Sequence, residues 1–79
     1  MSSMRRAIGR LIMVQESRFR MVTAGGQTLL FGLSHDSGVD ELDLLDLYRN
    51  DTQVAVEFRG EPGFETGIAH SISPFHNNV

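Results

Sequence analysis

The fold depends on residues 39–49, which read VDELDLLDLYR and lie between two groups of β-strand patterns. The triplets at 42–44 and 45–47 would also fit the two-residue period of a strand. A helix is favoured because aspartate is a poor strand former and leucine a good helix former. At about 100° per residue the apolar side chains gather on one side, with Leu42 at its margin; they are Leu44, Leu45, Leu47 and Tyr48. The segment therefore predicts one amphipathic helix within a chain of strands.

The ends of this helix carry matching signals. Ser37 and Asp40 have the three-residue spacing of a capping box. Asp40 and Glu41 fall in the first turn and Arg49 in the last, where the helix dipole favours these charges. Asn50 follows, and asparagine tolerates the left-handed conformation that often ends a helix.

Three strands are predicted before the helix. Residues 7–15 form an apolar, partly β-branched run in which Gly9 marks a bend or a bulge. Residues 18–23 begin with alternating polar and apolar side chains, and in residues 28–33 Leu29, Phe31 and Leu33 share one face. The glycine pair within residues 24–27 predicts a hairpin between these two strands, because positive φ costs glycine little.

Two strands are predicted after the helix, at residues 53–58 and 65–73, and Pro74 ends the second. In the last strand we expect one face to consist of Thr66, Ile68, His70 and Ile72. Alternation in the other strands predicts a set of inward side chains: Phe19, Met21, Leu29, Phe31, Leu33, Val54, Val56 and Phe58.

The resulting order, β-β-β-α-β-β, resembles the OB-fold superfamily across residues 7–73. The resemblance lies in the order and lengths of the elements, including the glycine in the long first strand and the helix between the third and fourth strands. It implies a mainly β domain with one helix, built as a five-stranded antiparallel barrel whose open end the helix plugs. An SH3-like barrel is the alternative, which a helix of about three turns fits less well.

Length and composition limit the class of protein. The 79 residues correspond to one domain, and we expect flexible ends at residues 1–6 and 74–79. The sequence contains no cysteine, which excludes disulfides and thiolate zinc sites and favours a reducing, cytoplasmic location. No apolar run approaches the ~18 residues of a membrane span, so we expect no membrane association.

Charge is distributed unevenly along a chain whose net charge is −3. Residues 1–20 carry five arginines and one glutamate, whereas residues 34–51 carry six acidic side chains and one arginine. The overall negative charge argues against broad attraction to nucleic acid. One basic face remains compatible with these numbers.

The OB-fold resemblance implies a binding groove formed by strands 2 and 3 with the loops joining strands 1–2 and 4–5. The residues placed there are Arg18 and Arg20 on strand 2, Arg59 and Phe64 at the 4–5 loop, and Arg10 on strand 1. Arginine pairs with phosphate and stacks on bases, so this set predicts a face for single-stranded nucleic acid or another short anionic ligand. Few aromatic side chains remain for stacking, because alternation turns most of the phenylalanines inward.

A protein-interaction or self-assembly module without a nucleic-acid role is the alternative, since a basic strand face and an acidic helix could dock on charged partners. We expect no enzyme, because no set of nucleophile, base and oxyanion donors can be named. Ser34-His35-Asp36 are adjacent and predict a turn rather than a catalytic triad. We expect no cofactor and no metal, and a structural role for His70 at the barrel mouth.

Overall fold

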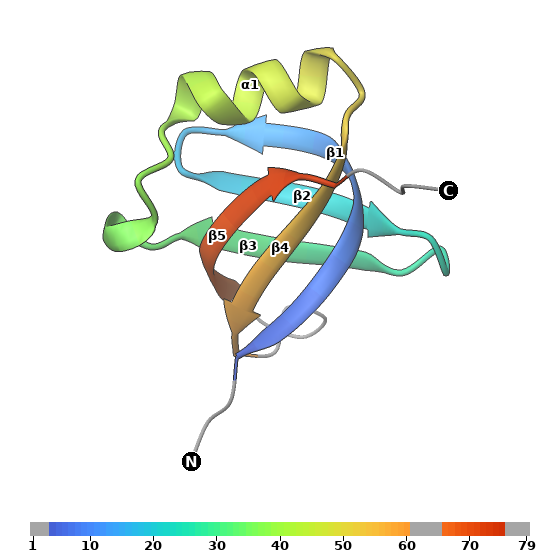
Figure 1. The fold of residues 1–79 in the computed structure, drawn as a ribbon, viewed down its shortest axis with the longest axis horizontal. Coiled ribbons are helices and arrows are strands. Elements are labelled where there is room, and N and C mark those ends of the chain that lie inside the picture. Colours follow the sequence, from blue (N-terminus) through green and yellow to red (C-terminus); the bar gives the residue numbers. More distant parts are fainter. Residues whose placement is uncertain (1–3, 61–65, 76–79) are drawn as a thin grey trace.

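The computed structural model describes residues 4–60 and 66–75, which form a closed five-stranded β-barrel with one α-helix (Figure 1). The mainly β class and the element order predicted from the sequence are confirmed. In chain order the elements are β1 (Arg5–Gln15), β2 (Arg18–Thr23), β3 (Thr28–Leu33), the short 3₁₀ helix η1 (His35–Ser37), α1 (Glu41–Arg49), β4 (Gln53–Arg59) and β5 (Gly67–Pro74).

The barrel closes in the order β1-β2-β3-β5-β4, and β4 pairs again with β1. This arrangement is consistent with an OB-like topology. The prediction of a wholly antiparallel barrel is wrong at one junction, because β3 and β5 run parallel from Phe31–Gly67 to Leu33–Ala69. A closed ring with an odd number of strands cannot alternate direction at every step, so one parallel pair follows from closure itself.

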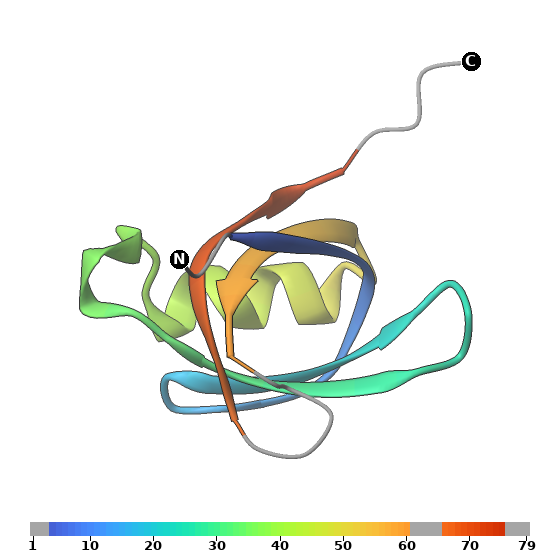
Figure 2. The same cartoon turned by 90° about the horizontal axis from the view of Figure 1, so that it is seen from below.

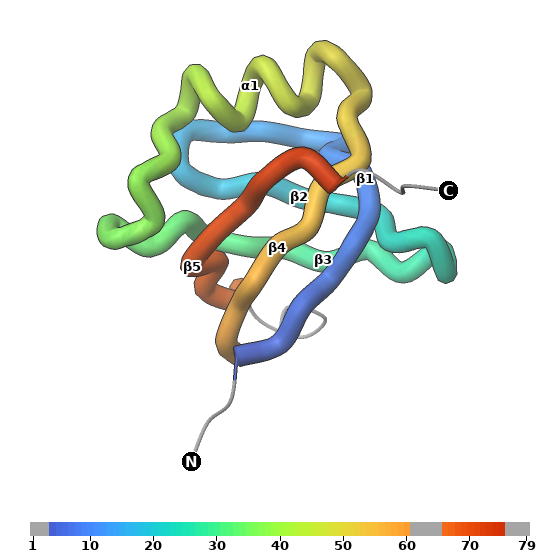
Figure 3. Tube along the Cα trace, viewed as in Figure 1, coloured from blue at the N-terminus to red at the C-terminus, as the bar shows by residue number. Residues whose placement is uncertain are grey.

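β1 is the longest strand and bends from one neighbour to the other, as its curved path shows (Figure 3). Its first half pairs with β4 and its second half with β2, and Gly9 has a partner on both sides. A Cβ at Gly9 would lie 2.1 Å from the carbonyl oxygen of Val22, so only glycine fits this crossing. The β-bulge of this strand lies at Ile12, between the paired residues Leu11 and Met13, so Gly9 marks a bend and not a bulge.

The core fills the barrel with the inward side chains of all five strands. Phe31 lies at its centre, with its ring centroid 5.3 Å from that of Phe19 and 4.9 Å from that of Phe58. The predicted inward residues are buried, with Leu33 half-buried against the cluster. Alternation therefore identified the inward side chains of β2, β3 and β4 correctly.

α1 lies across one end of the barrel, as the view along the barrel shows (Figure 2). Leu44 is fully buried in the core, Leu47 packs against it, and Leu45 is half-buried. Tyr48, which was predicted to be inward, is exposed because it lies at the edge of the buried stripe.

The caps of α1 differ from the prediction by a few residues. The N-cap is Asp40, whose side chain accepts a hydrogen bond from the Asp43 N–H while the Asp43 side chain accepts one from the Asp40 N–H. Ser37 instead accepts a hydrogen bond from the Val39 N–H within the preceding turn. At the other end Asp51, with a φ of 49°, takes the left-handed position expected for Asn50.

β5 contains a second bulge, which changes the faces expected for its side chains. Ser71 pairs with Glu57 and Ala69 with Phe58, so His70 is the extra residue between them. As a result Ile68 points outward while Ile72 is buried, and the predicted common face of these two residues is wrong. His70 is half-buried at this irregularity.

Candidate functional site

The outer surface of β2 carries the two arginines that the sequence singled out. Phe19 and Met21 are fully buried, so the period of two turns Arg18 and Arg20 outward, and both are exposed. About 6.8 Å separates alternate Cα positions along a strand, so the two guanidinium groups can reach one ligand together. We use the name β2–β3 face for the surface formed by these two arginines and the residues beside them, namely Met13, Gln15, Leu30, Gly32 and Ile68.

Strand register defines the neighbours of each arginine. Arg20 lies between Met13 on β1 and Leu30 on β3, and both of these side chains are half-buried. Apolar side chains on either side support the aliphatic stem of Arg20 and leave its charged end towards solvent. Arg20 is therefore a basic side chain at the centre of a short strip whose other members are apolar.

Arg18 has a more open setting, between Gln15 on β1 and Gly32 on β3. A hollow of about 150 Å³ lies beside it, lined by Gln15, Glu16 and Arg18 itself. Gly32 is paired in turn with Ile68 on β5, which is 45% exposed. Because Gly32 has no side chain, a ligand can approach the backbone here between Arg18 and Ile68.

Gly32 has room for a side chain on the outer surface. A Cβ added there would meet only the methyl group of Thr66, at 3.6 Å, which is an ordinary van der Waals contact. The fold therefore does not require glycine at this position, in contrast to Gly9. The bare backbone is a property of the surface and can be blocked by substitution without disturbing the barrel.

Both arginines are available for a ligand. Within residues 4–60 and 66–75, neither Arg18 nor Arg20 makes a side-chain hydrogen bond or an ion pair. Arginine held on a rigid strand can contact phosphate in a bidentate manner without first giving up a protein partner. Of the predicted site residues, these two are the pair that the structure brings together on one strand face.

Arg10 is placed differently from the other two. It lies on the outside of β1 opposite Val22, but its guanidinium bonds the Asp51 carboxylate at 2.9 Å and the Asp51 carbonyl oxygen at 3.0 Å. The contact ties β1 to the turn after α1, where Asp51 lies two residues beyond the last helical residue. Arg10 is therefore an anchor for the end of the helix, and its contribution to a ligand would require exchange of this partner.

Arg59 ends β4 and is paired with Ile68. The outward row thus runs Arg18, Gly32, Ile68, Arg59 across four strands, at about 4.8 Å per step. Three strand spacings, about 14 Å, separate Arg59 from Arg18 along this row, which is about twice the spacing between the two β2 arginines. Phe64 lies outside the described residues.

Aromatic side chains are scarce on the β2–β3 face, as expected. Phe19, Phe31 and Phe58 are in the core. Phe75 is half-buried, with the guanidinium of Arg6 5.5 Å from its ring centroid. Among the described residues, a ligand on this face meets aliphatic side chains and backbone in place of aromatic rings.

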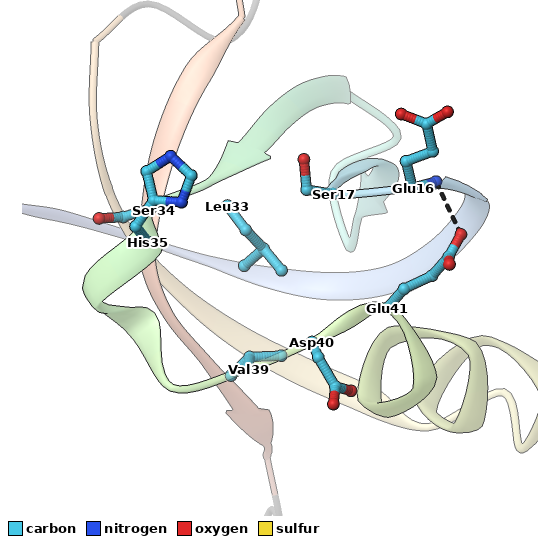
Figure 4. A pocket seen from close by; sticks show the side chains of 8 residues that line it. All are labelled: Glu16, Ser17, Leu33, Ser34, His35, Val39, Asp40 and Glu41. Carbon is cyan, nitrogen blue, oxygen red and sulfur yellow. Dashed lines mark hydrogen bonds between the residues drawn. The ribbon is translucent and has the colours of Figure 1, made fainter.

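A separate pocket of about 360 Å³ lies between the β1–β2 turn, η1 and the start of α1 (Figure 4). The Glu16 N–H donates to Glu41 Oε2 at 2.9 Å, which ties the turn to the helix. The Asp40 side chain accepts a hydrogen bond from the Asp43 N–H and so caps α1. Ser34 Oγ accepts a hydrogen bond from the Asp36 N–H at 3.3 Å, which forms the local turn predicted from the sequence. Asp40, Glu41 and Ser34 in this pocket therefore serve local structure.

Histidine and acidic side chains do not converge into a metal site in the described part of the chain. No described helix combines the length and the apolar character that crossing a bilayer requires. Sequence reasoning missed Met13, Gly32 and Ile68 as members of the β2–β3 face. The bulge at His70 concealed the outward direction of Ile68, whereas alternation with Phe31 could have identified Gly32.

Comparison of the chain with protein-family models, with curated proteins and with solved structures found no match. A proposal for the function therefore rests on the geometry of the barrel and its surface.

Proposed function

We propose that the protein is a small, non-catalytic OB-like module of the cytoplasm that binds short single-stranded nucleic acid on the β2–β3 face. The observation that carries the proposal is the pair of exposed arginines at alternate positions of β2, whose side chains have no partners among the described residues. OB-like barrels use the face of strands 2 and 3 for oligonucleotides. A phosphodiester chain supplies the anionic groups that two adjacent guanidinium groups recognise.

The expected affinity is weak. Base stacking on aromatic side chains contributes ~1–3 kcal/mol per base, and Leu30, Met13 and Ile68 provide only apolar contact in its place. The net charge of −3 also reduces long-range attraction to a polyanion. We therefore expect dissociation constants of about 10⁻⁴–10⁻⁶ M, the range of non-specific binding.

The test is fluorescence anisotropy with a labelled random oligonucleotide of about 12 nucleotides, within the ~4–16 nucleotides that one OB fold covers. Each phosphate contact contributes about −0.7 to the slope of log K against log salt, so Arg20→Gln should weaken binding and reduce the slope by about 0.7. Arg49→Gln is the matched control, since it removes the same charge from the exposed last turn of α1. Equal losses in both variants, or no binding by the wild type at ~100 μM, would reject the proposal.

Gly32→Glu provides an independent check. The added side chain fits the fold, because only the Thr66 methyl group lies within contact distance of the new Cβ. Its carboxylate would occupy the space beside Arg18 and repel phosphate. Binding should be lost while the circular dichroism spectrum stays that of the wild type, and retained binding would show that the ligand does not use this face.

A protein-interaction module is the second candidate, and one observation favours it. Leu42, on the outer side of α1, is 69% exposed and presents an apolar side chain to solvent. A concentration series by light scattering tests self-assembly through this surface. A monomer at every concentration would exclude it.

A further inference from the structure

A groove outside the β2–β3 face runs between α1 and the C-terminal half of β5. It has a volume of about 390 Å³. Its lining combines apolar and polar side chains: Val39, Leu47, Ile72 and Pro74, together with Asp43, Asp46, Asn50 and Thr52. The groove thus has an apolar floor and an acidic rim on the helix side.

The same half of β5 is an open strand edge. Pairing between β3 and β5 ends at Leu33 and Ala69, and the last backbone bond on this side joins the Ser34 N–H to the Ala69 carbonyl oxygen at 2.9 Å. The chain then leaves β3 for η1, while β5 continues to Pro74 with β4 as its only strand partner among the described residues. An open edge of this kind can accept another extended chain.

The direction of the free backbone groups follows from the β4–β5 ladder. The Phe75 N–H donates to the Gln53 carbonyl oxygen at 2.7 Å, and hydrogen-bonded pairs alternate with non-hydrogen-bonded pairs in an antiparallel ladder. Ile72 and Val56 are therefore a non-hydrogen-bonded pair. The N–H and carbonyl groups of Ile72 point away from β4, towards the open edge beside the groove.

The acidic rim determines the charge of the occupant. The Asp43 carboxylate accepts the cap bond from Asp40, whereas the Asp46 side chain is exposed and has no partner within residues 4–60 and 66–75. A cationic side chain next to Asp46 would gain an ion pair without breaking one. Charge complementarity therefore selects a basic ligand.

We propose that this groove binds an extended basic peptide segment of a partner protein by strand addition to β5. Its backbone would bond to Ile72, an aliphatic side chain would lie against Val39, Leu47 and Pro74, and an arginine or lysine would meet Asp46. Main-chain bonds and alternate side-chain contacts are the two components of this mode of recognition. A folded second copy fits less well, because its β2 arginines belong to a strand paired on both sides.

The probe is a labelled heptapeptide of alternating arginine and valine, titrated into isotopically labelled protein and followed by amide chemical shifts. We expect the amides of Asp46, Leu47 and Ile72 to shift, and Asp46→Asn to weaken binding about two- to fivefold, the equivalent of one exposed ion pair. Asp36→Asn is the matched control, because it removes the same charge from η1, which does not line the groove. It should leave the affinity unchanged.

A version of the peptide with its central amide methylated tests strand addition, since it cannot donate to the Ile72 carbonyl oxygen, and should bind more weakly. The proposal is overturned by equal binding of an alternating glutamate and valine peptide, by equal losses in the two aspartate variants, or by no shift at ~1 mM. Groove amides that shift on dilution of the protein alone would assign the groove to a second copy and also overturn it. Each result is independent of nucleic-acid binding, which the amides of β2 and β3 report.

Discussion

Two glycines in the strands predict opposite effects of the same substitution. A Cβ at Gly9 would lie 2.1 Å from the Val22 carbonyl oxygen and 2.9 Å from the Met21 Cε, inside the barrel wall. A Cβ at Gly32 would meet one methyl group at 3.6 Å on the outer surface. Gly9→Ala should therefore destabilise the protein, whereas Gly32→Ala should leave it unchanged or stabilise it.

The size of the Gly9 effect can be estimated from the overlap. The closest ordinary approach of a carbon to a carbonyl oxygen is about 3.3 Å, so β1 and β2 must separate locally by about 1 Å. Overpacking costs ~1–3 kcal/mol, and disturbed ladder bonds add ~1 kcal/mol each, which gives about 3 kcal/mol in total. A domain of this length has about 4–12 kcal/mol of stability, so much of it would be lost. Gly32→Ala should instead contribute about 0.5–1 kcal/mol through the lower backbone entropy of the unfolded chain.

The assay is urea and thermal denaturation followed by far-ultraviolet circular dichroism on both variants and the wild type. For a domain of this size ~1 kcal/mol corresponds to about 4–8 °C, so Gly9→Ala should lower Tm by about 12–24 °C. The reasoning is refuted if Gly9→Ala stays within ~0.5 kcal/mol of the wild type, or if Gly32→Ala is the more damaging change.

Four further substitutions test the packing and the caps of α1 by the same denaturation measurements. Leu44→Ala should cost about 2–5 kcal/mol of stability because this side chain is fully buried. Leu42→Ala should change stability by less than ~0.5 kcal/mol, because the Leu42 side chain is 69% exposed. Similar values for the two variants would mean that α1 packs in another orientation. Asp40→Ala should cost about 1 kcal/mol through loss of the capping box, and no change would show that the box does not stabilise the helix. Asp51→Gly should be nearly neutral, because glycine adopts the left-handed backbone conformation at lower cost and this gain offsets the loss of the exposed ion pair with Arg10. A loss of stability above ~1 kcal/mol would show that the ion pair contributes more than an exposed pair usually does.

β2 and β3 were predictable because their side chains alternate between the core and the outer surface. In β2 the alternation of Arg18 and Arg20 with Phe19 and Met21 indicates that the segment is a strand and also shows which of its two faces points to the core. The same pattern identifies the two arginines of the candidate site from the sequence alone. Long-range contacts are not needed for these conclusions, since each depends only on neighbouring residues.

The errors arise where one residue breaks the period or where a partner lies far away in sequence. The bulges at Ile12 and His70 each add one residue without a compositional signal, and the second reversed the face of Ile68. The contact between Arg10 and Asp51 joins residues 41 positions apart in the sequence, and nothing in the residues next to either one indicates it. The capping box moved from Ser37 to Asp40 because aspartate occurs at both positions required, 40 and 43.

The groove between α1 and β5 could not be predicted for a related reason. It exists because β3 stops pairing with β5 at Ala69 while β5 continues to Pro74, which is a property of strand lengths in the closed barrel. Asp46 is recognisable in the sequence as a solvent-facing helix residue, but its position beside an open strand edge is a tertiary feature.

An amide chemical-shift map of the isotopically labelled protein with a short single-stranded oligonucleotide at low salt tests the proposed nucleic-acid face most directly. We expect shifts concentrated at residues 18–20 and 28–32, which shrink as salt is added because arginine–phosphate contacts release counterions. Shifts confined to α1, or the absence of shifts at ~100 μM ligand, would contradict the assignment of β2 and β3 as the binding surface.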